Sequence, residues 1–236
     1  MKVIHHGILL KKRNYSETSL ITTFYTLEQG VQTYIFQGGK KKKGNALHAL
    51  SCFELEAYFR SDSELGKLTA VYPDPILNNL PFHPIKTSIS FFIAELLGYC
   101  LSTSEPDEAL FQFLKQEIQW IDQSNELTNY PIWFLVTFLN YLGCVPQNET
   151  SHPTYLDLKE GEFLTHLPRE GFQYFDDAAV PYWSQMMSQT KNEALGTPLP
   201  IVIRKLLLHN LLHYYAHHVP GYKTPKSLEV IRTVLG

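Results

Sequence analysis

The first 75 residues alternate between short runs of β-branched or aromatic residues and clusters of turn-forming residues. Alternation is clearest in residues 20–25, where Leu20, Thr22 and Phe24 would share one face of a strand. The pattern predicts five strands, over residues 3–12, 19–27, 30–39, 47–60 and 65–73. Strands of this number and spacing suit a small closed barrel, because closure removes exposed edges. An SH3-like barrel has the same period, so the pattern leaves the type of barrel open.

After the proline- and asparagine-rich segment 72–84, the hydrophobic period becomes helical. Helices are predicted over residues 85–101, 104–121, 131–143, 180–188, 200–218 and 225–235. Ser104 is the expected N-cap of the second of these helices. Residues 131–143 are apolar on all sides, which is typical of a helix at the centre of a bundle.

Residues 144–180 lose this periodicity and are predicted to form a loop-rich insertion, with a short hairpin pairing Tyr155–Leu158 with Glu162–His166. The expected division is therefore a barrel domain at 1–78, a helical domain at 79–143 and 181–236, and the insertion at 144–180. The fold class is α+β with several domains.

The formal net charge of -3 conceals an uneven distribution along the 236 residues. Residues 1–43 carry a net charge of +6, residues 44–200 carry -13, and residues 201–236 carry +4. Two basic ends around an acidic middle indicate a polyanionic partner. The chain has no apolar run of roughly 18 residues and no secretory start, so we expect a cytoplasmic protein without a membrane partner. Three widely separated cysteines are expected to be buried thiols and not a disulfide framework.

Four consecutive lysines, Lys40–Lys43, stand where a hairpin loop between the third and fourth strands is expected. Loop lysines neutralise phosphates without reading sequence, although any exposed loop also tolerates them. A basic run at the end of the first strand could lie on the same side of the barrel, and an aromatic residue could stack on bases. Aromatic residues at strand spacing are, alternatively, core residues. The candidate DNA-binding residues are Lys11, Lys12, Arg13, Tyr34, Lys40, Lys41, Lys42, Lys43, Arg60 and Lys67.

His209, His213 and His217 recur every four residues on the predicted helix at 200–218. Such spacing can bind zinc, but the helix lacks the glutamate of an HExxH motif and an obvious third ligand, so a polar stripe is favoured over a metal-dependent hydrolase. No nucleophile, P-loop or dinucleotide-binding motif is present. We therefore predict no enzymatic activity, no cofactor and no metal.

The C-terminal segment combines an apolar helical stripe with basic residues. Burial in the bundle explains the stripe, but any exposed part could accept an acidic, hydrophobic peptide. The candidate partner-binding residues are Arg204, Lys205, Lys223 and Lys226.

Three segments, in this order, resemble the RecO family of bacterial DNA repair and recombination mediators. They are GILLKKRNYSETSLITTFYT from Gly7, GVQTYIFQGGKKKKGN from Gly30, and HNLLHYYAHHVPGYKTPKSLEVIRTVL from His209. The resemblance is strong at both ends, and the middle matches by helix order and length.

This resemblance implies a five-stranded OB-type β-barrel followed by an all-α helical bundle, in which many members of the family carry an inserted zinc module. It also implies binding of single- and double-stranded DNA, annealing of complementary strands, and loading of RecA together with RecR. The helical body would dock the acidic C-terminal tail of single-stranded DNA-binding protein (SSB). Zinc modules of the family carry four cysteines, whereas this chain has only Cys144 there, and His152 and His166 do not complete a set. We therefore expect a degenerate, metal-free insertion. The alternative function is a protein–protein adaptor whose barrel does not bind DNA.

Overall fold

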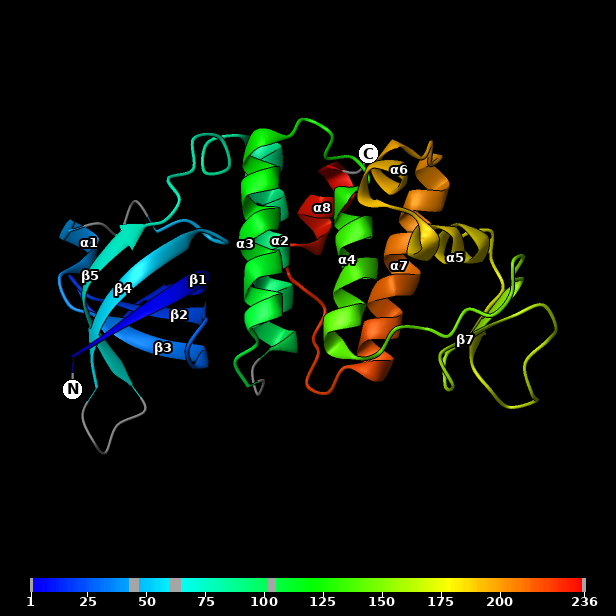
Figure 1. Ribbon diagram of the computed structural model, residues 1–236, viewed down its shortest axis with the longest axis horizontal. Helices are drawn as coiled ribbons and strands as arrows, with labels where there is room; N and C mark the ends of the chain where they lie inside the picture. Colours follow the sequence, from blue (N-terminus) through cyan, green and yellow to red (C-terminus); the bar gives the residue numbers. More distant parts are fainter. Residues whose placement is uncertain (1, 43–46, 60–64, 102–104, 235–236) are drawn as a thin grey trace. The chain divides into compact units, whose positions relative to one another are not determined.

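The computed structural model describes residues 2–42, 47–59, 65–101 and 105–234 (Figure 1). The chain forms two compact units, which are described separately below. The first comprises residues 1–125 and 225–227, and the second comprises residues 126–224 and 228–236.

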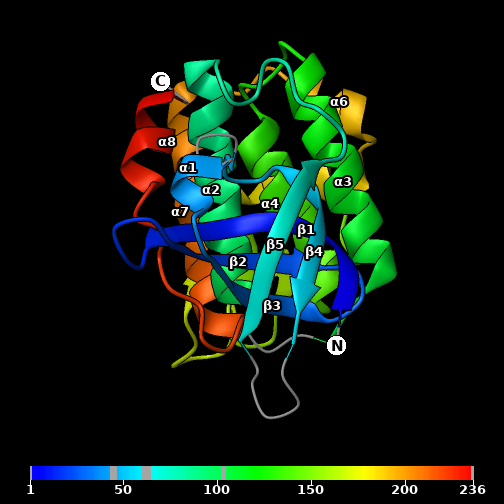
Figure 2. The ribbon, with the colours of Figure 1, turned by 90° about the vertical axis from the view of Figure 1, so that its left-hand side faces the viewer.

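Five strands of the first unit form a closed barrel with the order β1-β2-β3-β5-β4 (Figure 2). They are β1 (Lys2–Asn14), β2 (Leu20–Thr26), β3 (Gly30–Phe36), β4 (Cys52–Tyr58) and β5 (Gly66–Pro73). The neighbouring strands are antiparallel except for β3 and β5, which are parallel and close the barrel. All five predicted strands are confirmed.

Alternation along the strands divides barrel residues between an inner and an outer face. Leu20, Thr22 and Phe24 of β2 are buried on the inner face, as the sequence predicts. Tyr25 points outward but is also buried, because its ring packs 6.3 Å from that of Phe111 and its hydroxyl donates to the carbonyl of Asp107 at 3.3 Å. Helix α3 (Glu108–Gln123) therefore covers this part of the outer face.

The connection from β3 to β4 is not the predicted hairpin, because β5 lies between these two strands in the barrel. Its first part is one helical turn, α1 (Gly39–Lys42). The backbone N–H of Lys40 donates to the carbonyl of Thr18 at 3.3 Å, so α1 begins against the turn between β1 and β2. The lysine run thus starts on a crossover connection near the β1–β2 turn.

Two predicted helices complete the first unit, α2 (Pro84–Cys100) and α3. The N-cap of α3 is Asp107, whose side chain accepts from the N–H of Leu110 at 3.0 Å, so the prediction of Ser104 as N-cap is wrong. The proline-rich segment that precedes α2 is fixed by Asp122, whose carboxylate accepts from the N–H groups of Asn79 and Leu80 at 2.8 and 2.6 Å.

This anchorage joins the predicted linker to α3, and it explains why the first compact unit extends beyond the strands. The predicted division at residues 78, 143 and 180 stays a prediction.

The second unit contains helices and a small sheet. The helices are α4 (Tyr130–Leu142), α5 (Val180–Ser188), α6 (Lys191–Gly196), α7 (Ile201–His218) and α8 (Leu228–Val234), of which α6 is not predicted from the sequence. The predicted hairpin is confirmed as β6 (Tyr155–Asp157) and β7 (Glu162–Leu164), with β8 (Tyr174–Phe175) added to β6. Over the described ranges of the chain, no helix combines the length and apolarity that a membrane span requires.

Candidate nucleic-acid interface

A row of outward-facing side chains crosses four strands of the barrel and has a cation at each end. The register pairs Arg13 with Ile21, Ile21 with Ile35, and Ile35 with Lys67. Arg13 and Lys67 are exposed, and the two isoleucines between them are half-buried. Residues that are paired across strands share a face, so both cations project from the outer side of the barrel.

Lys11 lies beside this row on the same face. It pairs with Thr23, which pairs with Thr33, and the two threonine hydroxyls are hydrogen-bonded at 3.2 Å. The register shifts between Leu9 and Lys11, and this β-bulge changes the phase of alternation along β1. Leu9 is therefore in the barrel core whereas Lys11 is exposed on the outer face.

Lys12 lies on the opposite side of β1 from Lys11 and Arg13. It pairs with Thr22, a fully buried residue of the inner face. Although Lys12 is exposed, partial desolvation lowers the pKa of its amine. Burial lowers the pKa of the His48 imidazole, and the nearby Lys12 charge lowers it further. The three basic residues of β1 are thus divided between two faces, and two of them join Lys67.

Lys40 of α1 lies beside the turn between β1 and β2, which comes just after Arg13 in the chain. Its Nζ donates to the carbonyl of Ser16 at 2.9 Å, which fixes it against the β1–β2 turn. The backbones of Lys41 and Lys42 belong to α1, but their side chains, and the whole of Lys43 and Arg60, lie outside the described residues.

Tyr34 cannot serve as a stacking platform, and this prediction is wrong. Its side chain is fully buried in the barrel core, with its ring edge-on to that of Phe24 at 5.9 Å. Its hydroxyl lies 2.7 Å from Nδ1 of His5. Burial raises the pKa of the Tyr34 hydroxyl. Tyr34 is a structural residue beneath the open end of the barrel.

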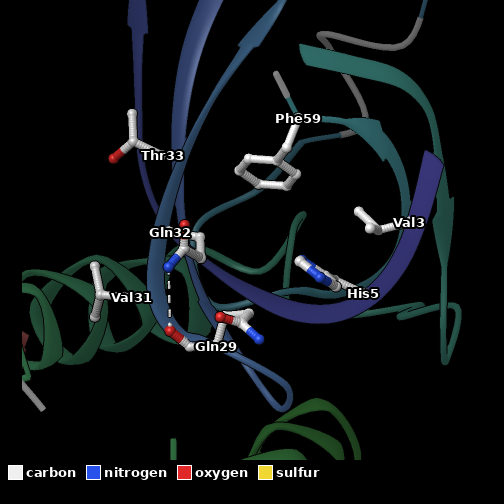
Figure 3. A pocket seen from close by; sticks show the side chains of 7 residues that line it. All are labelled: Val3, His5, Gln29, Val31, Gln32, Thr33 and Phe59. Carbon is white, nitrogen blue, oxygen red and sulfur yellow. Dashed lines mark hydrogen bonds between the residues drawn. The ribbon is translucent and has the colours of Figure 1, made fainter. Parts of the chain in front are cut away.

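At that open end lies a groove of about 570 Å³ that the sequence did not reveal (Figure 3). It is lined by Val3, His5, Gln29, Val31, Gln32, Thr33 and Phe59. The signal available in the sequence was a pair of polar residues, His5 and Gln32. Each lies two residues before a position that faces the barrel interior, Gly7 on β1 and Tyr34 on β3. Polar residues on the inner face mark the place where the interior meets solvent.

The candidate partner-binding residues lie on α7 and in the connection that follows it, and they belong to both units. Lys205 is exposed and Arg204 half-buried on α7, and Lys223 is exposed after this helix. Lys226 is exposed in the segment 225–227, which belongs to the first unit. In that segment, Ser227 donates through its N–H and hydroxyl to Glu95 of α2 at 3.0 and 2.8 Å.

The residues of the insertion do not fit a zinc ion. Within the described ranges, no three histidine, cysteine or acidic side chains gather where they could hold a metal. Burial raises the pKa of the Cys144 thiol to about 11, which disfavours the thiolate that zinc requires. The imidazoles of His209 and His213 on α7 are exposed, with ring centroids 6.1 Å apart.

The closed barrel, with its β3–β5 parallel closure and exposed cations on the outer face, defines the first unit as an OB-type fold, a class that binds oligonucleotides and oligosaccharides. Residues 1–73 match the family model described as "Recombination protein O N terminal", and residues 82–228 match "Recombination protein O C terminal". The chain therefore belongs to the recombination protein O (RecO) family of DNA repair proteins.

Curated relatives agree with this assignment over nearly their whole length. The chain is 28% identical to a protein of Flavobacterium psychrophilum named "DNA repair protein RecO", over 99% of both chains. It is 26% identical to a protein of the same name from Christiangramia forsetii over 98% of both chains, and 28% identical to one from Phocaeicola vulgatus over 96% of both.

Proposed function

We propose that this chain is a non-enzymatic, DNA-binding recombination mediator that binds single- and double-stranded DNA through its barrel. The observation that supports this most is the grouping of Lys11, Arg13 and Lys67 on one outer face of an OB-type barrel, in a member of the RecO family. Their paired neighbours are isoleucine and threonine side chains of β2 and β3, together with Tyr58 of β4, which pairs with Lys67. Flexible cations in such surroundings contact phosphates whatever the sequence. Binding is therefore expected to depend on phosphates and not on sequence.

The same charges account for strand annealing. Two DNA strands repel each other, since each carries a negative charge at every phosphate. Cations on the barrel, including the lysine run Lys40–Lys43, neutralise part of this charge and let complementary strands approach. No covalent chemistry is needed, so neither cofactor nor metal enters the proposal.

The helical part would recruit protein partners in the cytoplasm, at DNA under repair. The acidic C-terminal tail of SSB is the proposed ligand of Arg204, Lys205 and Lys223 in the second unit, because cations at the surface attract an acidic peptide. Cooperation with RecR and assistance to RecA loading on SSB-coated DNA are part of this proposal, which membership of the RecO family supports.

A fluorescence anisotropy titration tests the proposal. We expect the purified chain to bind short single strands, with an affinity that falls steeply between about 50 and 200 mM salt. Equal affinity for unrelated sequences would agree with phosphate-based binding. If no binding is measurable at the lower salt concentration, the barrel does not hold DNA, and an adaptor function takes its place.

A further inference from the structure

The groove at the open end of the barrel arises from incomplete strand pairing. In β1, residues 2–6 pair with β4, and the pairing with β2 begins at Gly7. In β3, pairing with β5 covers only Tyr34–Phe36, which leaves Gly30–Thr33 paired with β2 alone among the described strands. The barrel is therefore closed at the level of Tyr34 and open beyond it.

The described residues that line this groove combine polar, aromatic and aliphatic side chains. The side chains of His5, Gln32 and Phe59 point toward the same hollow, and those of Val31 and Thr33 project from the other side of β3 (Figure 3). No lysine, arginine, aspartate or glutamate is among the seven lining residues. These seven described residues offer a phosphate no lysine or arginine, whereas they offer a neutral ring both hydrogen-bonding and apolar partners.

His5 offers a donor to such a ring. The Tyr34 hydroxyl lies 2.7 Å from Nδ1 of His5, and burial raises the pKa of Tyr34 and lowers the pKa of His5. Burial therefore favours the neutral form of both groups, and in the tautomer whose Nδ1 accepts from the Tyr34 hydroxyl, Nε2 carries the ring proton and is a donor. The amide of Gln32 donates to the carbonyl of Gln29 at 3.2 Å, which fixes the side chain beside the hollow.

Phe59 supplies an apolar surface. Its ring is packed edge-on to Tyr34 at 5.7 Å and tilted against His5 at 5.9 Å between centroids, and it remains half-buried. Gly66 makes this packing possible, because a Cβ there would approach Tyr34 to 2.6 Å and Phe59 to 2.7 Å. The ring is thus held at the rim by its neighbours.

We propose that the groove accepts one unstacked nucleobase of a DNA strand, with Phe59 in contact with the face of the base and His5 and Gln32 hydrogen-bonded to its edge. This inference rests on the proposed DNA-binding function. The volume of about 570 Å³ lies within the range of about 300–1,000 Å³ that is usual for small-ligand sites. Aromatic and amide side chains are the groups that proteins use for unstacked bases.

The groove adjoins the basic outer face. Thr33 lies at the rim of the groove and continues the row that runs from Lys11 through Thr23. Ile35, two residues further along β3, belongs to the row of Arg13 and Lys67. A strand whose phosphates follow the cations therefore passes the rim of the groove, where one base can turn inward.

The test compares two oligonucleotides of equal length, oligothymidylate and a strand in which abasic sites replace the bases. We expect wild-type protein to bind oligothymidylate at least about fivefold more tightly, with a similar salt dependence for both strands. Gln32→Ala and Phe59→Ala should each reduce this preference, and leave binding of the abasic strand unchanged. The control is Gln37→Ala, an exposed glutamine just after β3, which should keep the wild-type preference.

The outcomes separate this inference from the proposed function. Equal, salt-sensitive binding of both strands by the wild type overturns the groove as a base site and leaves DNA binding by the barrel intact. Failure of the wild type to bind either strand overturns the proposed function itself. Thermal unfolding shows whether Phe59→Ala remains folded. If it does not, Gln32→Ala decides: an unchanged preference for bases overturns the inference.

Discussion

Replacing Lys11, Arg13 and Lys67 together by alanine removes three cations from one outer face of the barrel. Three strand spacings separate Arg13 from Lys67, which is about 14 Å around the sheet at about 4.8 Å per spacing. Lys11 lies two residues from Arg13 along β1, or about 7 Å. One DNA strand places a phosphate every 3.4 Å or so, and the three cations can therefore contact different phosphates at once.

The expected loss follows from counterion release. Each phosphate contact contributes about 0.7 to the slope of log K against log salt for a single strand, so three contacts contribute about 2. At about 0.1 M salt, the same relation predicts a loss of affinity of about 100-fold. Anisotropy titrations of a labelled oligothymidylate at several salt concentrations measure both quantities.

A matched control removes the same number of charges elsewhere. Lys159, Arg169 and Arg232 are exposed cations of the second unit, and their joint replacement by alanine changes the net charge equally. We expect the slope of this variant to stay close to that of the wild type. A barrel variant that keeps the wild-type slope, or a control that loses as much, would refute the assignment of the outer face.

Three further predictions concern the lysine run and two buried polar groups. Alanine at all four positions of Lys40–Lys43 should weaken binding equally on unrelated DNA sequences and flatten its salt dependence, as anisotropy would show. Asp122→Ala should lower the free energy of unfolding by about 3 kcal/mol in urea denaturation, because the N–H groups of residues 78–80, of which that of Leu80 is buried, lose their acceptor. Burial alone would raise the pKa of Asp122, but these donors lower it below its ordinary value. The stability that the Asp122 carboxylate contributes is therefore complete above about pH 4 and is lost as the pH falls through the lowered pKa. The difference in unfolding free energy between Asp122→Ala and the wild type should accordingly shrink in acid. Tyr34→Phe should cost about 1 kcal/mol of stability through the lost bond to His5 and leave the salt slope of DNA binding unchanged.

The sequence predicted the secondary structure well because periodicity is a local property. Strand alternation at Leu20, Thr22 and Phe24 and the helical period after residue 84 both match the structure. The order of strands was not predictable in the same way. The expected hairpin between β3 and β4 is absent because β5, distant in sequence, pairs with both strands. Local patterns do not say which distant strand pairs with which.

The candidate site was predictable in composition but not in arrangement. Strict alternation would place Lys11 on the inner face with Leu9, and only the bulge between them moves it outward. Tyr34 was assigned wrongly because an aromatic residue in a strand has the same spacing in a core as on a binding surface. Lys67 joins Arg13 through register, which no single segment of the sequence contains.

The most direct test of the account is an annealing assay with complementary oligonucleotides coated with SSB. The account predicts that the wild-type chain accelerates duplex formation, that the triple variant at Lys11, Arg13 and Lys67 loses this acceleration, and that the charge-matched control keeps it. Acceleration that is absent in the wild type, or fully retained by the triple variant, would contradict the claim that the barrel brings the strands together.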